Sequence, residues 1–170
     1  MSFEYSVGDP NSDERGSGAR ANGGKPQLEL IPLATWEAVL SKIGYTLHQQ
    51  AILYALSRWQ SGAGDMEAVM GELTPEDLLF ATKVLEYGIE KYAAWNWAKG
   101  MKWSIPVGCF LRHFVSMGRG EEIDPESGCH HWGHCVANIV MLDHFEKHCP
   151  DMNDIKVPEL NAAWHREHSE

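Results

Sequence analysis

The sequence predicts an all-α domain, a helical bundle of about four to six helices. Apolar residues recur at helical spacing in several long segments, and clear helix start signals precede two of them. The sustained alternation of polar and apolar residues that marks a half-buried strand is missing. With 170 residues, the chain has the length of one domain that can bury a genuine core.

The N-terminal segment has a different composition from the rest. Residues 1–24 contain few apolar side chains and many Gly, Ser, Asn and Asp residues. Such a segment buries too little surface to offset its ordering entropy, so we expect a flexible, disordered N-terminal arm. The stretch KPQLELIPL alternates apolar positions and is predicted to form a short extended piece. A single all-α domain is then expected over residues 25–150, followed by a tail over residues 151–170.

The first two helices are marked by apolar stripes and N-terminal caps. One begins near Thr35 and continues or restarts through residues 47–59. The other begins at Thr74, where a hydroxyl cap, a proline at the first helical position and two acidic residues stand in sequence. Its stripe predicts a helix that runs to about Asn96.

Two further helices complete the expected bundle. Ser104 and Pro106 start one of them, which carries Val107, Phe110 and Phe114 on one face. The last long helix runs from about residue 128 to residue 148, because a proline follows at position 150.

The charge balance limits the classes of partner. Asp and Glu total 24 against 14 Lys and Arg, which argues against binding nucleic acid or an anionic membrane, because both need a basic surface. No apolar run reaches the roughly 20 residues of a membrane span, and the N-terminus lacks the apolar core of a signal peptide. The four cysteines form no CxxC pair, so we expect a reduced, cytoplasmic protein.

The last predicted helix begins with histidines and ends in apolar residues. At about 100° per residue, His131, His134 and Asn138 fall in the same sector as Leu142 and Phe145. The helix therefore has a core-facing stripe whose first half is polar, and we expect a partner opposite the imidazoles.

Three acids stand just before this helix, in a turn punctuated by proline and glycine: Glu121, Asp124 and Glu126. Carboxylates and imidazoles that converge at the mouth of a bundle can hold a divalent cation, such as Mg²⁺, Mn²⁺, Co²⁺ or Zn²⁺. In the alternative interpretation, the histidines hydrogen-bond buried partners and the acids cap the helix. From the residues alone, the two interpretations weigh about equally.

Other residues are weaker candidates. His113, at the edge of an apolar stripe, could bind a metal or move a proton, although a lone histidine there is more often structural. Glu86 and Glu90 lie one turn apart on one helix face, where a solvated pair is the default interpretation and a second metal position the sharper one. A zinc ribbon built on Cys129, His130, His134 and Cys135 is disfavoured, because the spacing does not match paired-ligand loops.

Several motifs together resemble the phage-encoded dATP/dGTP diphosphohydrolases, relatives of the MazG-like all-α nucleotide pyrophosphohydrolases. The family pattern runs GKP…LIP, YGxxKYxxxNWxKG, RH and GExxDxESGxxHxxH. This sequence meets it over residues 23–32 and 84–142 with GGKPQLELIP, VLEYGIEKYAAWNWAKGMKWS, LRHFVSMGRGEEIDPESG and HHWGHCVANIVML. The match is specific because several unusual polar positions recur together in the same order.

Two departures from the family patterns concern the pocket and the metal. The segment of residues 33–76 is longer than the corresponding connection in the family pattern. We interpret it as a helical insertion that serves oligomerisation or reshapes the nucleoside pocket. MazG relatives hold metals on EExxE and ExxD helices. Here Glu121 and Asp124 have the ExxD spacing in a proline-broken turn, while His131 and His134 occupy the next helix, so the ligand pair stays open.

The resemblance implies metal-dependent hydrolysis of a purine deoxynucleoside triphosphate to the monophosphate and pyrophosphate. In phages that replace adenine by 2-aminoadenine, such an enzyme supplies dGMP and depletes dATP, which implies the host cytoplasm as the location. It implies Mg²⁺ or Mn²⁺ as the cofactor, with Co²⁺ as a further option. It also implies a homo-oligomer, a dimer or tetramer.

The resemblance also implies roles for individual residues. The catalytic candidates are Glu121, Asp124 and His113. The metal ligands are expected among Glu121, Asp124, Glu126, His131 and His134, with Glu86 and Glu90 as a weaker pair. The phosphate-binding candidates are Lys91, Arg112 and Lys25, and the base-binding candidates are Asn96 and Trp97.

Two other classes of protein remain alternatives. A phosphohydrolase of the histidine–aspartate type would need an adjacent His–Asp pair, which this chain lacks. A non-catalytic helical metal-binding or interaction protein would share the composition but would release no pyrophosphate from dGTP.

Overall fold

The computed structural model describes residues 7–40 and 44–155, and within them the fold is all-α, as predicted. Among these residues, the only β-type pairings are isolated bridges, between Val7 and Arg20 and between Ile123 and His130. The α-helices are α1 (Leu33–Leu40), α2 (Leu47–Gln60), α3 (Met66–Glu72), α4 (Pro75–Lys91), α5 (Ser104–Gly118) and α6 (His131–His148). Three short 3₁₀ helices are η1 (Leu28–Leu30), η2 (Asn96–Lys99) and η3 (Pro150–Met152).

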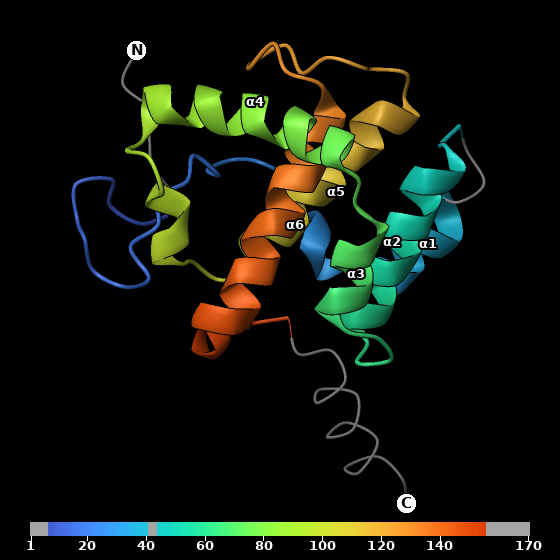
Figure 1. Cartoon of the computed structure of the whole chain (residues 1–170), viewed down its shortest axis with the longest axis horizontal. Helices are drawn as coiled ribbons and strands as arrows, with labels where there is room; N and C mark the ends of the chain where they lie inside the picture. Colours follow the sequence, from blue (N-terminus) through green and yellow to red (C-terminus); the bar gives the residue numbers. More distant parts are fainter. Residues whose placement is uncertain (1–6, 41–43, 156–170) are drawn as a thin grey trace, which may run out of the picture.

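Helix α6 is the centre of the domain (Figure 1). It packs most extensively on α4 and α5, and α1, α2 and α3 form a layer beside it. Buried residues lie all round the first three turns of α6, as expected of a helix that is covered on every side. The approach of α4 is close: a Cβ atom at Gly133 would lie 2.6 Å from the carbonyl oxygen of Phe80, so this position requires glycine.

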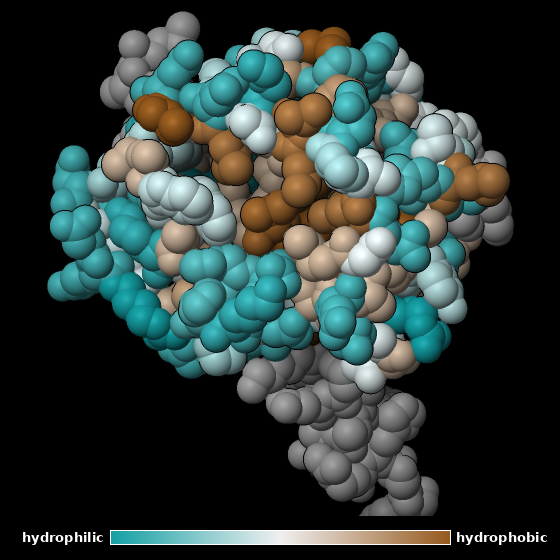
Figure 2. Space-filling model, in the orientation of Figure 1, coloured by the Kyte–Doolittle hydropathy of each residue, from teal (hydrophilic) through white to brown (hydrophobic). Residues whose placement is uncertain are grey.

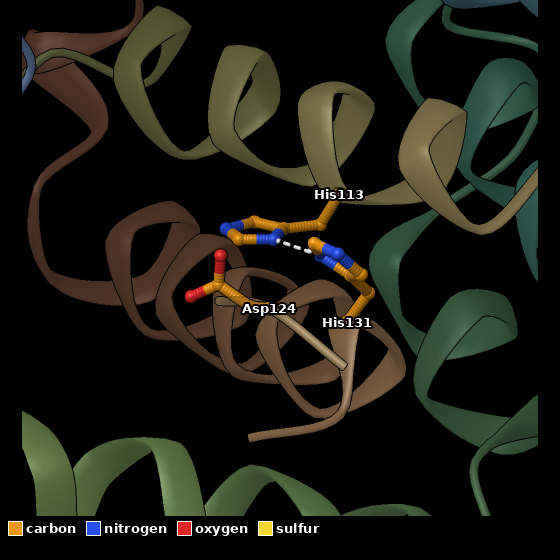
Figure 3. A group of neighbouring side chains, drawn as sticks. All are labelled: His113, Asp124 and His131. Atoms are coloured by element: carbon orange, nitrogen blue, oxygen red, sulfur yellow. Dashed lines mark hydrogen bonds between the residues drawn. The ribbon is translucent and has the colours of Figure 1, made fainter. Parts of the chain in front are cut away.

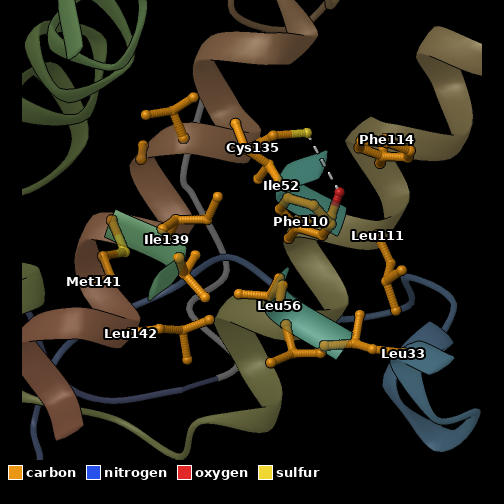
Figure 4. Close-up of a cluster of buried hydrophobic side chains, with 14 of the residues drawn as sticks. Leu33, Ile52, Leu56, Phe110, Leu111, Phe114, Cys135, Ile139, Met141 and Leu142 are labelled. Atoms are coloured by element: carbon orange, nitrogen blue, oxygen red, sulfur yellow. Dashed lines mark hydrogen bonds between the residues drawn. The ribbon is translucent and has the colours of Figure 1, made fainter. Parts of the chain in front are cut away.

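The hydrophobic core draws on all six of these α-helices (Figure 4). It includes Phe110 and Phe114 of α5 and Ile139 and Leu142 of α6, together with buried side chains of α1, α2, α3 and α4. Each of these side chains contributes about 1.5–3 kcal/mol to folding when it is fully buried. The core therefore holds α6 against α5. The polar stripe of α6, formed by His131, His134 and Asn138, lies in the first half of this helix.

The helix boundaries confirm two start signals and correct a third start and one end. Helix α1 begins at Leu33, before the predicted cap Thr35. Thr74 caps α4 through a capping box with Asp77, and α5 begins at Ser104, both as predicted. Helix α4 ends at Lys91 and not near Asn96, because the backbone of the next residue, Tyr92, is extended (φ −131°, ψ 165°). Trp95 then adopts a left-handed conformation with φ 64° before η2. The predicted extended piece also differs, since its middle forms η1.

The N-terminal segment packs on the domain from residue 7 onward. We call residues 7–24 the strap; residues 1–6 of the predicted arm lie outside the described residues. The backbone amide of Gly16 donates to the carbonyl oxygen of Lys99 at 2.6 Å, and that of Gly18 donates to Gly100 at 3.0 Å. Arg15 forms an ion pair with Asp151. Polar contacts of this kind, which composition does not reveal, attach the strap.

None of the described helices combines the length and apolar character needed to cross a membrane. The segment predicted as an insertion, residues 33–76, contains α1, α2 and α3 in its described part. Residues 156–170 of the predicted tail lie outside the described residues.

Candidate active site

Two helices and the loop between them bring His113, Asp124 and His131 together (Figure 3). His113 comes from α5, His131 begins α6, and Asp124 stands in the connecting turn. One ligand atom from each of the three side chains lies within 4.8 Å of the other two. The Nδ1 atoms of the two imidazoles are 2.8 Å apart. The structure thus unites three candidates that the sequence singled out separately.

The imidazole of His131 has an incomplete set of partners. The side chain is almost fully buried, with a relative exposure of 3 %. Its Nε2 atom has no hydrogen-bond partner, and the nearest carboxylate oxygen, from Glu121, is 3.7 Å away. A buried polar atom without a partner costs about 1–3 kcal/mol. A ligand that approaches Nε2 would remove this cost.

Ser127 links Asp124 to the second histidine of the α6 stripe. Its hydroxyl donates to Oδ2 of Asp124 at 2.6 Å, and it lies 2.7 Å from Nε2 of His134. Because a hydroxyl has one proton, it must accept the second bond, so Nε2 of His134 is the donor. The rings of His134 and His113 stack with centroids 4.0 Å apart. His134 therefore orients the cluster through Ser127.

The environment sets the protonation states that metal ligands need. Burial alone would raise the pKa of Asp124, but the hydrogen bonds from the hydroxyl and the backbone amide of Ser127 counteract it, and the pKa lies below its usual value. Burial, followed by the neighbouring His113, lowers the pKa of His134 to about 3 and also lowers that of His131. Carboxylate and neutral imidazole are the forms that bind cations.

The other predicted acids have different surroundings. Glu126 accepts a hydrogen bond from Nζ of Lys91 at 2.7 Å and lies 3.8 Å from that of Lys25. The hydrogen bond from Lys91 lowers the pKa of Glu126. Glu86 pairs with Lys83 at the surface, and Glu90 is exposed. Among the described residues, only His113, Asp124 and His131 converge as a ligand group.

The cluster opens into a cavity of about 520 Å³, a volume that suits a small-molecule ligand. Its walls come from α4, α5, α6, the segment around η2 and the strap. Cationic and aromatic side chains line the cavity together with the cluster: Arg20, Lys25, Lys91, Arg112, Tyr87, Tyr92, Trp95 and Trp97. Cations suit phosphate groups and flat rings suit a nucleobase.

The predicted phosphate-binding residues all reach this cavity. Lys91 is held over the ring of Tyr87, with Nζ 4.6 Å from the centroid. Arg112 donates to the side-chain oxygen of Asn22 at 2.7 Å and to the carbonyl oxygen of Pro26 at 3.1 Å. Together with Lys25, these residues give the cavity positively charged side chains, although the chain as a whole is acidic.

The two predicted base-binding residues differ in their contacts. The amide of Asn96 is buried and exchanges two hydrogen bonds with the backbone of Ala19, so it holds the strap. Trp97 packs edge-on against His144, and its ring centroid lies 5.9 Å from that of Trp95. Trp95 is 72 % exposed and offers the more accessible ring.

Sequence reasoning missed Arg20 and Ser127 as site residues. Ser127 stands inside the GExxDxESG pattern, directly after the candidate Glu126, so the motif itself was the available signal. Arg20 had no such signal, because it belongs to a segment whose composition predicts no packing.

An all-α domain with a histidine–carboxylate cluster in a cavity of cations and aromatic rings has the parts of an α-helical nucleotide hydrolase. The chain belongs to the dATP/dGTP diphosphohydrolase family: the family's N-terminal domain matches residues 55–155. The predicted family is therefore confirmed, and the chain is an enzyme of the nucleoside triphosphate pyrophosphohydrolase class. No curated protein and no solved structure matches the chain.

Proposed function

We propose that the protein hydrolyses the purine deoxynucleoside triphosphates dGTP and dATP to the monophosphate and pyrophosphate, with a divalent cation bound at His113, Asp124 and His131. The convergence of ligand atoms from His113, Asp124 and His131 within 4.8 Å of one another is the observation that carries the metal site, and the buried Nε2 atom of His131, which has no hydrogen-bond partner, supports it. Family membership supports the substrate class.

The donor set suits a divalent ion. Two imidazoles and one carboxylate favour Mn²⁺ or Co²⁺, and Mg²⁺ is acceptable when water completes its shell. Glu121, beside His131, is the nearest further carboxylate, while Ser127 and His134 orient Asp124. A bound ion would spread the charge of the triphosphate and lower the pKa of a coordinated water.

The protein's own groups would divide the remaining work. Glu121 is exposed at the edge of the cluster, where it can orient and deprotonate the attacking water. Lys91, Lys25 and Arg112 would hold the phosphates. Trp95 and Trp97 would receive the base, whereas Asn96 would act indirectly by fixing the strap.

Pyrophosphate release tests this function. We expect the purified protein to release pyrophosphate from dGTP or dATP when Mn²⁺ or Mg²⁺ is present and to lose this activity in chelator. Release of single phosphates, or equal activity in chelator, would refute the proposal. Release of another product would favour a different phosphohydrolase, and release of no product would favour a non-catalytic binding protein.

The biological setting and assembly are part of the same proposal. The enzyme would act in the host cytoplasm of a phage that builds 2-aminoadenine DNA, where it supplies dGMP and depletes dATP. A homo-oligomer is supported by a hydrophobic area between α4, α6 and α3 on the face that Figure 2 shows. Several large apolar side chains are exposed, among them Leu47, Leu79 and Ile89. Light scattering that gives the monomer mass of 19.1 kDa at micromolar concentration would contradict it.

A further inference from the structure

We propose that Arg20, which the strap carries into the cavity, is a phosphate-binding residue that faces the metal cluster. The inference rests on the proposed function, because it assigns part of the same triphosphate substrate. It concerns a residue outside the matched span 55–155.

The guanidinium of Arg20 lies in the groove between α5 and α6. It donates to Oδ1 of Asn138 at 2.9 Å, to Sγ of Cys109 at 2.9 Å and to Sδ of Met141 at 3.2 Å. It also lines the same cavity as the histidine–aspartate cluster. The strap thus inserts a permanent positive charge between two helices that both carry site histidines.

The sequence positions of its partners place this charge close to the cluster. Cys109 comes one helical turn before His113, and Asn138 comes one turn after His134. Four residues of α-helix advance by about 6 Å, so the guanidinium lies about one turn from the imidazoles.

A divalent ion and a guanidinium at this separation repel each other unless an anion lies between them. A phosphate of the substrate would supply that anion. Arginine suits the task because its planar group keeps its charge at every physiological pH and can bind two phosphate oxygens at once. On this basis Arg20 and the ion would bind the phosphate chain from opposite sides.

The strap positions Arg20 from both sides along the chain. Before it, Ala19 exchanges hydrogen bonds with the amide of Asn96. After it, the backbone amide of Ala21 donates to the hydroxyl of Tyr92 at 3.0 Å. Gly18 passes so close to the carbonyl oxygen of Gly100 that a Cβ atom would lie 2.7 Å from it. These contacts hold the residues on each side of Arg20, so the guanidinium is positioned before substrate arrives.

The strap provides its own matched control. Arg15 is a second arginine of the strap, but it pairs with Asp151 at the surface and does not line the cavity. Arg20→Gln and Arg15→Gln therefore remove the same charge from the same segment at two places. Arg20→Lys keeps the positive charge but replaces the planar guanidinium, which can bind two oxygens at once, with an ammonium group.

The experiment measures dGTP turnover and calorimetric binding of pyrophosphate with Mn²⁺ for each variant, after thermal melts have shown that it is folded. We expect Arg20→Gln to lower kcat/KM by about 100-fold and to weaken pyrophosphate binding by at least about 10-fold, the range of a lost charge-assisted contact to a reacting group. Arg20→Lys should weaken pyrophosphate binding less than Arg20→Gln, and Arg15→Gln should stay within about threefold of the parent.

Three results would overturn the assignment. Unchanged pyrophosphate affinity in Arg20→Gln with altered preference between dGTP and other nucleotides would make Arg20 a base contact. An equal loss in Arg15→Gln would trace the effect to strap attachment. If Arg20→Gln does not fold, the test rests on Arg20→Lys. Parental pyrophosphate affinity in Arg20→Lys would then refute the claim that the planar guanidinium of Arg20 binds two phosphate oxygens. A parent protein that releases no pyrophosphate would instead refute the proposed function itself.

Discussion

Two clusters of aspartate and histidine in this molecule differ in whether their hydrogen-bonding atoms are satisfied. In the first, Asp77 at the start of α4 accepts hydrogen bonds from Nε1 of Trp132 at 2.7 Å, from the amide of Thr74 at 2.8 Å and from Nε2 of His48 at 2.8 Å. Both carboxylate oxygens have partners. In the second, the Nε2 atom of His131 is buried and has none.

Residue types alone therefore do not separate a structural cluster from a binding site. Asp77 and His48 have the composition of a catalytic pair, yet every contact of Asp77 stays within the fold and joins α2, α4 and α6. The cluster of His113, Asp124 and His131 leaves a ligand position open and lines a cavity. An incomplete hydrogen-bond set, next to space for a ligand, is the feature that sets the proposed metal cluster apart from the network around Asp77.

The largest expected effect is the loss of activity in Asp124→Asn. We expect turnover of dGTP to fall by at least about 100-fold. Changing a residue that only orients a metal ligand already costs about 10- to 100-fold, and Asp124 is proposed as a ligand itself. Circular dichroism should show unchanged helix content. Glu86→Gln, which changes an exposed acid outside the cavity, is the control. A variant that melts early yet turns over dGTP at the parental rate per folded molecule would make this cluster structural as well.

His134→Ala should lose less activity than Asp124→Asn, because His134 reaches Asp124 through Ser127. We expect a fall of about 10- to 100-fold. Raising the Mn²⁺ concentration should restore part of this activity, since the variant has a weakened metal site and not a missing ligand. Activity that stays low at every Mn²⁺ concentration would contradict this role and favour a packing defect.

The structural cluster should give the opposite pattern. Asp77→Asn should lower the free energy of unfolding by about 1–3 kcal/mol, because it leaves buried donors without their acceptor. Urea denaturation measures this change, and turnover per folded molecule should match the parent. A variant of parental stability with reduced turnover would reverse the roles assigned to the two clusters.

The smallest expected effect is a change in the pH dependence of stability. Burial alone would raise the pKa of Asp77, but the hydrogen bonds from Thr74, Trp132 and His48 outweigh it, and the pKa lies below its usual value. Its stabilising contribution is present above the unfolded pKa of about 3.9 and is lost as pH falls through the folded pKa. Melting temperatures between pH 5 and pH 3 should fall more steeply in the parent than in Asp77→Asn. Parallel profiles would contradict this explanation.

Local signals predicted much of this protein because helix starts and helix faces depend on neighbouring residues. Thr74 and Pro75 begin α4, and the wheel that puts His131 and His134 on the core-facing stripe of α6 agrees with their burial. The turn with Asp124 then had to stand near that stripe, since only a few residues separate them. The fold class and the nearness of Asp124 to His131 followed from such short-range relations, whereas His113 comes from a separate helix.

Contacts between residues that are far apart in the chain could be seen only in the tertiary structure. The pairing of Glu126 with Lys91, the network around Asp77 and the insertion of Arg20 all join residues from separate elements. Arg20 lies more than a hundred positions from Asn138 in the chain, and no local preference of either residue encodes their contact. The physical reason is that such contacts form only after the apolar core has fixed the helices relative to one another.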